Sequence, residues 1–197
     1  MAQRIFHVGD FIALLRSTWA EFALALATML LILLLPIQTG VAVGIFLSLA
    51  HGVFTTTRAQ PILFEQAPGS TIWWPASDAR PGTMLPGVVV MGFQAPLSFL
   101  NAYDFRRGVT QALKDAGAAK LFVLEASGIV EIDFTAASIL AGVIAGARKA
   151  GVDFAIARLE SVRAQQAFGR FGITQQLGED HLFDSVDEAV QALAPKA

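Results

Sequence analysis

The sequence predicts an α/β domain preceded by a transmembrane α-helical hairpin. Residues 22–57 contain no Asp, Glu, Lys or Arg, and this length exceeds the ~20 residues that one spanning helix needs. From Gly87 onward, short apolar runs alternate with segments of helical periodicity, which is typical of strands joined by helical crossovers. Composition agrees: 54% of the residues are hydrophobic and 15% are charged. Soluble domains average about 45–50% and 25%, so lipid is expected to solvate part of the chain.

A helix break divides the uncharged segment into two arms. Pro36 removes a helical donor and Gly40 permits a turn. The arms are residues 22–35 and 41–54, each roughly 21 Å long at ~1.5 Å per residue, which is short of a ~30 Å hydrocarbon core. The first arm gains length if its helix extends backwards to Phe11.

Two membrane geometries compete, a hairpin with both ends on one side and a single kinked span. Arg4 and Arg16 precede the apolar segment and Arg58 follows it. Basic residues favour the cytoplasmic side, so the hairpin satisfies both flanks and is preferred. A hairpin in a soluble core is disfavoured because neither arm has a polar face.

Small residues recur every four positions in the second arm, at Gly40, Gly44, Ser48 and Gly52. This spacing places them on one helix face, where another backbone can approach closely. We interpret the stripe as a packing face for further membrane helices. Chance in a Gly- and Ala-rich segment is the alternative.

Three regions follow from these patterns: a membrane hairpin (1–58), a Pro-rich linker (59–86) and an α/β domain (87–197). The linker has room for one short edge strand at 62–64. Its Trp73 and Trp74 fit either a membrane interface or a cover over the following domain.

Periodicity predicts three buried strands and four helices in the last region. The helix over 101–116 has Asn101 as a candidate N-cap, and Gly151 ends the helix over 135–150. Ser185 opens the last helix with a capping box. The strands are 88–91, 121–124 and 154–157; the remaining helices run from Ser161 to near Gly172 and from Ser185 to Leu193.

Several classes of chemistry are absent from the sequence. There is no cysteine, which excludes disulfides, thiolate zinc sites and cysteine nucleophiles. The net charge of −2 argues against a nucleic-acid surface. The three histidines lack metal spacing, and no phosphate-binding, nucleophile-elbow or dinucleotide motif occurs. We therefore predict neither an enzyme nor a bound metal or cofactor.

The turn at residues 133–135 is nevertheless a candidate phosphate-binding site. Asp133 closes an apolar segment and Thr135 begins a helix, with Phe134 between them. This places a hydroxyl beside free backbone N–H groups at the positive helix end, an environment that would stabilise a phosphate. From the residues alone, a simple helix cap by Asp133 or Thr135 is favoured.

The segment IVEIDFTAASIL (129–140), the preceding LFVLEASG (121–128) and the FLNA entry to the first helix (99–102) resemble a STAS domain. With the hairpin and Ala67-Pro68-Gly69, the chain resembles the C-terminal end of SulP-family anion transporters, the sulfate permeases, over residues 10–193. The resemblance implies a small mixed sheet with packed helices, placed after the last two membrane helices of a secondary active transporter. It also implies a chain in the cell (inner) membrane with a cytoplasmic C-terminal domain in a regulatory role.

The resemblance also implies a set of binding partners and an alternative function. The expected partners are the lipid bilayer, the remaining transporter helices or a second copy, and cytosolic regulatory proteins. The alternative is a membrane-tethered signalling protein like the anti-sigma-factor antagonists, which are phosphorylated on the last residue of an Asp-Ser-Ser turn. Thr135 occupies that acceptor position here, while Phe134 departs from the family pattern.

Overall fold

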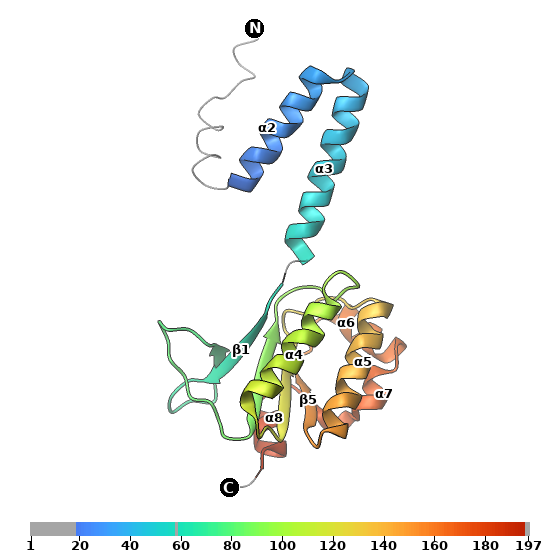
Figure 1. Ribbon diagram of the computed structural model, residues 1–197. Helices are drawn as coiled ribbons and strands as arrows, with labels where there is room; N and C mark the ends of the chain where they lie inside the picture. Colours follow the sequence, from blue (N-terminus) through green and yellow to red (C-terminus); the bar gives the residue numbers. More distant parts are fainter. Residues whose placement is uncertain (1–18, 58, 196–197) are drawn as a thin grey trace. The chain divides into compact units, whose positions relative to one another are not determined.

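The computed structural model describes residues 19–57 and 59–195, which fall into two compact units divided between Thr56 and Thr57 (Figure 1). Arg4, Arg16 and Arg58, on which the choice of membrane side rests, lie outside the described residues, as does Phe11.

The first unit is an antiparallel pair of helices, α2 (Trp19–Leu34) and α3 (Ile37–Thr57) (Figure 1). A β-carbon added at Gly40 would lie 2.8 Å from the Cα of Ile32, and one at Gly44 would lie 2.6 Å from Cγ2 of Thr28. The later residue of α3, Gly44, contacts the earlier residue of α2, Thr28, so the two helices run antiparallel and form a hairpin. The single kinked span is thereby excluded.

The break between the helices is shorter than the sequence suggested. Gly40 lies inside α3, and only Leu35 and Pro36 separate the two helices. Pro36 comes immediately before the first turn of α3, where a missing N–H group costs no helical hydrogen bond. The helix can therefore restart directly after the proline.

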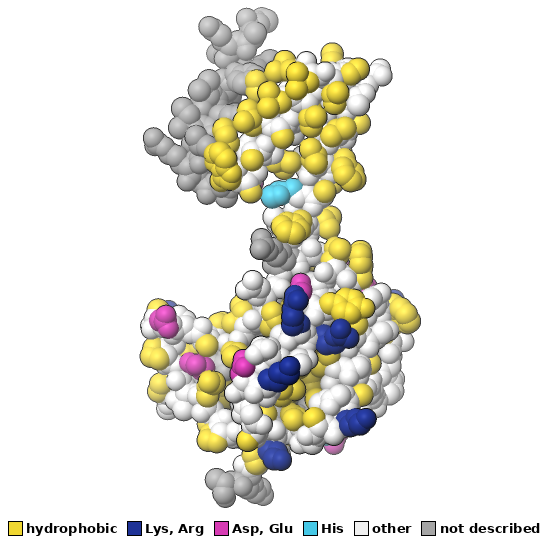
Figure 2. Space-filling view, viewed as in Figure 1, with side chains coloured by type: hydrophobic (Ala, Val, Ile, Leu, Met, Phe, Trp, Pro, Cys, Tyr) yellow, Lys and Arg dark blue, Asp and Glu magenta, His cyan; other side chains and the backbone are white. Residues whose placement is uncertain are grey.

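Apolar side chains cover the visible face of both helices (Figure 2). Among the described helices, α3 alone is long and apolar enough to cross a membrane, over Ile37–Thr55, while the 16-residue α2 is shorter. Leu33, Leu34 and Phe46 are all largely exposed. In water such a surface would be an aggregation site, so its composition matches lipid.

The second unit contains a six-stranded sheet in the order β2-β1-β3-β4-β5-β6. Strands β3 to β6 are parallel, while β1 pairs antiparallel with both β3 and β2. The strands are β1 (Pro61–Gln66), β2 (Trp73–Pro75), β3 (Val88–Phe93), β4 (Leu121–Glu125), β5 (Asp153–Ala157) and β6 (Leu182–Phe183). The helices are α4 (Ala102–Ala116), α5 (Phe134–Lys149), α6 (Val162–Arg170), α7 (Ile173–Leu177) and α8 (Val186–Leu193), with a 3₁₀ turn η2 (Glu179–His181).

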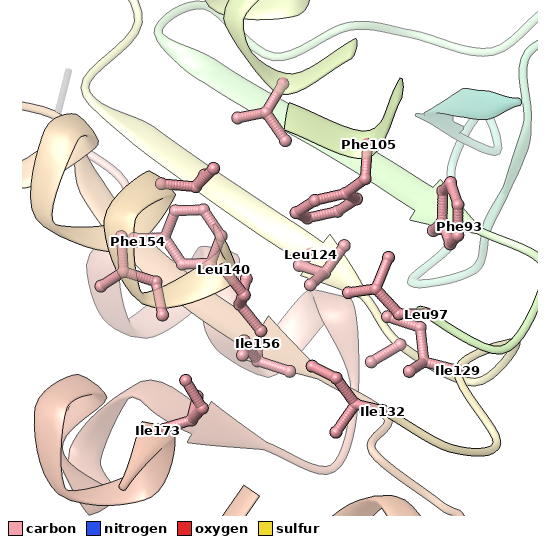
Figure 3. Close-up of a cluster of buried hydrophobic side chains, with 14 of the residues drawn as sticks. Phe93, Leu97, Phe105, Leu124, Ile129, Ile132, Leu140, Phe154, Ile156 and Ile173 are labelled. Atoms are coloured by element: carbon pink, nitrogen blue, oxygen red, sulfur yellow. The ribbon is translucent and has the colours of Figure 1, made fainter. Parts of the chain in front are cut away.

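Side chains on the central strands alternate between two hydrophobic clusters, one on each face of the sheet. Phe122 and Leu124 of β4 enter the larger cluster with residues of α4 to α7, which Figure 3 shows in part. Leu121 and Val123 enter the smaller cluster with residues of α8. Burial on both faces explains why the sequence of these strands is continuously apolar rather than alternating.

Residues 59–86 are part of the α/β unit rather than a linker, which corrects the predicted organisation. The predicted edge strand at 62–64 lies within β1, which is an interior strand between β2 and β3, and the edge strands are β2 and β6. Trp73 packs against the smaller core cluster, so it covers the domain. The short elements α7, η2 and β6 were not predicted either.

The contact between α4 and β1 gives a stability prediction. A β-carbon at Gly108 would lie 2.2 Å from Cγ of Pro61, whereas one at Gly142 of α5 meets no atom within 4 Å. Gly108→Ala should destabilise the unit by about 1–3 kcal/mol through overpacking. Gly142→Ala should stabilise it by about 0.5–1 kcal/mol, because alanine is the better helix former. Thermal unfolding in detergent, followed by near-ultraviolet circular dichroism, compares the two; equal shifts would contradict this packing.

Candidate functional site

The turn before α5 is built around the carboxylate of Asp133. Its Oδ1 accepts a hydrogen bond of 2.8 Å from the backbone N–H of Ala136, so Asp133 is the N-cap and the helix begins at Phe134. The sequence had left the cap open between Asp133 and Thr135. The structure gives it to Asp133, which satisfies one of the free N–H groups at this helix end.

The second oxygen of Asp133 ties the turn to the loop between β3 and α4. Oδ2 accepts a hydrogen bond of 2.7 Å from the backbone N–H of Phe99. The backbone N–H groups of Asp133 and Leu97 add further links between the two loops, donating to the carbonyls of Leu97 and Glu131. One carboxylate thus holds together two loops at the carboxyl end of the parallel strands, where ligand sites of such sheets form.

Thr135 is exposed in the first turn of α5, and no hydrogen bond joins its hydroxyl to the described residues. Helix geometry leaves the N–H groups of Phe134 and Thr135 without intrahelical acceptors. A phosphate would therefore meet two N–H groups and the positive helix end, but also the nearby carboxylate of Asp133. Phe134 is 71% exposed and contacts Phe171 edge-on, with ring centroids 5.9 Å apart.

Asn101 has a different role from the predicted one. It stands at the N-cap position of α4 but makes no side-chain cap bond. Instead it is 2% exposed, its Nδ2 donates to the carbonyls of Thr57 (3.1 Å) and Pro96 (2.9 Å), and its Oδ1 accepts from the N–H of Ser98 (2.8 Å). Asn101 therefore fixes the start of the second unit to the loop that also contacts Asp133.

The sequence analysis did not predict an ion pair at the same end of the sheet, between a buried carboxylate and a partly exposed arginine. Glu125 closes β4, is 2% exposed and lies 3.4 Å from the guanidinium of Arg158, which has a positive φ of 58°. The pair borders a cavity of about 160 Å³ that Ser185 also lines. The available signal was a carboxylate at the end of an otherwise apolar strand, since a buried charge requires a partner.

The histidines and acidic residues form no metal site among the described residues, where no group of three potential ligands occurs. His181 lies between two carboxylates, 2.9 Å from Asp153 and 2.9 Å from Asp180. The hydrogen bond from the His181 ring lowers the pKa of Asp180 below its ordinary value. His7 lies outside the described residues.

The stripe on α3 divides into two halves. Gly40 and Gly44 are buried against α2, so they serve packing within the hairpin. Ser48 and Gly52 are exposed, and a β-carbon at Gly52 meets no atom within 4 Å. A packing face for further helices remains a prediction for these two residues.

An apolar helical hairpin therefore precedes a mixed sheet in which a capped strand–helix turn holds the neighbouring loop. This arrangement defines a STAS-type domain attached to a pair of helices, and among the described helices α3 is long and apolar enough to cross a membrane. The family model for the STAS domain matches residues 83–189, and the chain belongs to this family. It is homologous to the C-terminal regions of SulP sulfate transporters.

Among curated relatives, probable sulfate transporters from two strains of Mycobacterium tuberculosis are 33% identical over 97% of this chain and 34% of their own length. Solute carrier family 26 member 10 of Mus musculus is 24% identical over 96% of the chain and 29% of its own length. The chain thus spans about a third of the relatives that it matches.

The fold is shared with a solved membrane protein. The inward-facing structure of the murine anion transporter Solute Carrier 26 family member A9 has a TM-score of 0.80 at 21% identity, covering 91% of this chain and 29% of that chain. The likeness extends over most of this chain and confirms the predicted α/β fold.

The double role of Asp133 is testable. Asp133→Ala should cost about 1–2 kcal/mol for the lost cap and should also speed amide hydrogen exchange at Phe99, whose N–H loses its acceptor. Ser185→Ala is the matched control, because Ser185 caps α8 by accepting from Glu188 and does not bond Phe99. Unchanged exchange at Phe99 in Asp133→Ala would refute the bridging role.

Proposed function

We propose that this chain supplies the last membrane hairpin and the cytoplasmic STAS domain of a SulP-type anion transporter. One observation carries the proposal: the 33% identity to probable sulfate transporters extends over 97% of the chain and includes both units. A sulfate-like anion is the proposed cargo, following the names of those relatives. The anion pathway itself is proposed to lie in the other membrane helices of the transporter.

In this proposal the hairpin contributes packing surface rather than a transport site. The described residues of α2 and α3 carry one acidic residue, Glu21, and one histidine, His51. An intramembrane anion site would need polar or charged groups facing the helix bundle. Ser48 and Gly52 are exposed small residues where another helix can approach closely, so we assign this face to the remaining transporter helices.

The STAS domain is proposed to regulate the transporter through contacts with other proteins, and the Asp133 turn is the proposed point of control. Phosphorylation of Thr135 would add ~1.5–2 negative charges beside Asp133. That charge would repel the carboxylate holding the N–H of Phe99, and it would loosen the joined loops. The alternative, a tethered signalling protein of the anti-sigma-antagonist type, gains less support because the matching relatives include the hairpin.

Coexpression tests the proposal. The partner is the M. tuberculosis probable sulfate transporter, truncated to remove the third that this chain matches. We expect the two chains to copurify and together to take up sulfate into vesicles, while neither does so alone. Gly52→Leu should reduce copurification severalfold, because it fills open space on the face assigned to other helices.

Two controls accompany this experiment. Gly52→Ala adds one methyl group and should still copurify. This control distinguishes the effect of a large side chain from the effect of replacing glycine. Gly44→Leu should instead disturb the hairpin itself, since its side chain would meet Thr28. Normal copurification of Gly52→Leu would contradict the assigned face, and absence of copurification and uptake for the unaltered pair would contradict the proposed function.

A further inference from the structure

Four large apolar side chains remain uncovered at the end of the domain where α4 and α5 begin. We call Phe99, Leu100, Tyr103 and Phe134 the aromatic patch; they are 61%, 48%, 60% and 71% exposed. They lie together because Phe99 donates its N–H to Asp133, the residue before Phe134, and because Leu100 and Tyr103 flank Asn101 and Ala102. Figure 2 shows yellow apolar side chains at this end of the domain.

Three carboxylates and three guanidinium groups lie around the patch, and all of them except Arg106 are paired or bonded within the domain. The carboxylates near it are engaged: Asp104 pairs with Arg107, Glu131 lies 3.5 Å from Arg163, and both oxygens of Asp133 accept N–H bonds. Arg106 has no carboxylate within ion-pair distance in the described part of the chain, and its guanidinium stacks 4.9 Å from the ring centroid of Tyr103. The patch therefore presents aromatic rings and one free cation.

Only a short stretch of chain connects the apolar span to the loop that carries the patch. Asn101 donates to the carbonyl of Thr57 over 3.1 Å, and Thr57 is two residues beyond Thr55, where the span ends. Two Cα spacings cover at most about 7 Å, so a short stretch of backbone joins the span to the carbonyl that Asn101 holds. Phe99, Leu100 and Tyr103 lie within two residues of Asn101.

We propose that the aromatic patch inserts into the headgroup region of the bilayer that holds the hairpin, with Arg106 contacting the phosphates of anionic lipids. Aromatic rings favour this region of a membrane, and each Arg or Lys near an anionic surface adds about 1 kcal/mol of attraction. The inference rests on the proposed membrane anchoring. A protein covering the patch is the competing occupant.

The absence of cysteine in the chain makes the inference measurable in the full-length protein. Single nitroxide labels are placed through Phe134→Cys in the patch and Leu33→Cys on the exposed surface of the hairpin. Met84→Cys is the control, because Met84 is 64% exposed and lies near Asp115 and Ala116, at the far end of α4. The protein is reconstituted in vesicles of equimolar phosphatidylcholine and phosphatidylglycerol, and collision rates with oxygen and with a water-soluble nickel chelate are measured.

We expect the ratio of oxygen to nickel collisions at position 134 to be severalfold higher than at position 84, approaching that at position 33. A ratio equal to that at position 84 would overturn the inference by showing a water-exposed patch. Low collision rates with both reagents would also overturn it, by showing a protein contact. If the label at position 33 itself collides mainly with nickel, the membrane anchoring fails, which is a separate result.

A second variant tests the lipid chemistry. Arg106→Gln removes the free cation and leaves the aromatic rings in place, and its side chain lies on the solvent side of α4. With the label at position 134, we expect phosphatidylglycerol to raise the oxygen-to-nickel ratio over pure phosphatidylcholine in the unaltered background and to lose most of that increase in Arg106→Gln. An equal increase in both backgrounds would overturn the assignment of Arg106.

Discussion

The proposed membrane anchoring depends on one constraint: an apolar helical hairpin, whose described residues include one acidic side chain, Glu21, needs a non-aqueous environment. Large side chains such as Leu34 and Ile37 are more than two-thirds exposed on the described hairpin. Two of its hydroxyls bond within their own helices: that of Thr28 donates to the carbonyl of Leu24, and that of Thr55 donates to the carbonyls of His51 and Gly52. A helix pair built this way needs no water, as a membrane segment requires.

The second unit follows the opposite rule, because it buries its apolar residues on both faces of a sheet. Two side chains hold its loops together. Asp133 joins the start of α5 to the loop between β3 and α4, and Asn101 joins that loop to Thr57. Asn101 is buried, and a buried polar group is costly unless it is hydrogen-bonded. Its amide oxygen accepts one hydrogen bond and its amide nitrogen donates two, which holds this loop in place.

Much of the fold was readable from the sequence, for identifiable reasons. The strand at 121–124 was recognisable because both of its faces are buried, and the helix over 135–150 because its cap and its ending residues are local signals. The interior position of β1 was not, since it depends on pairing with β3, where Pro61 lies opposite Phe93. The short elements α7, η2 and β6 carry too few residues for a periodicity.

The site was predicted less completely, because local patterns do not identify distant partners. The sequence pattern predicted Asn101 as a helix cap, yet its side chain bonds the carbonyl of Thr57, which is 44 positions away in the sequence. The stripe on α3 was visible as a pattern, but only the structure shows that Gly40 and Gly44 face α2 while Gly52 faces outward. Glu125, at the end of an apolar strand, indicated that a charged partner was needed, but no local pattern identified Arg158 as that partner.

The most direct measurement is the labelling of single cysteines by a membrane-impermeant maleimide in intact cells. Gln38→Cys lies in the first turn of α3, at the closed end of the hairpin, and Asp78→Cys lies on an exposed loop of the second unit. For a hairpin in the membrane with a cytoplasmic domain, we predict labelling at position 38 in intact cells and at position 78 only after permeabilisation. Labelling at position 78 in intact cells would contradict this arrangement of the chain.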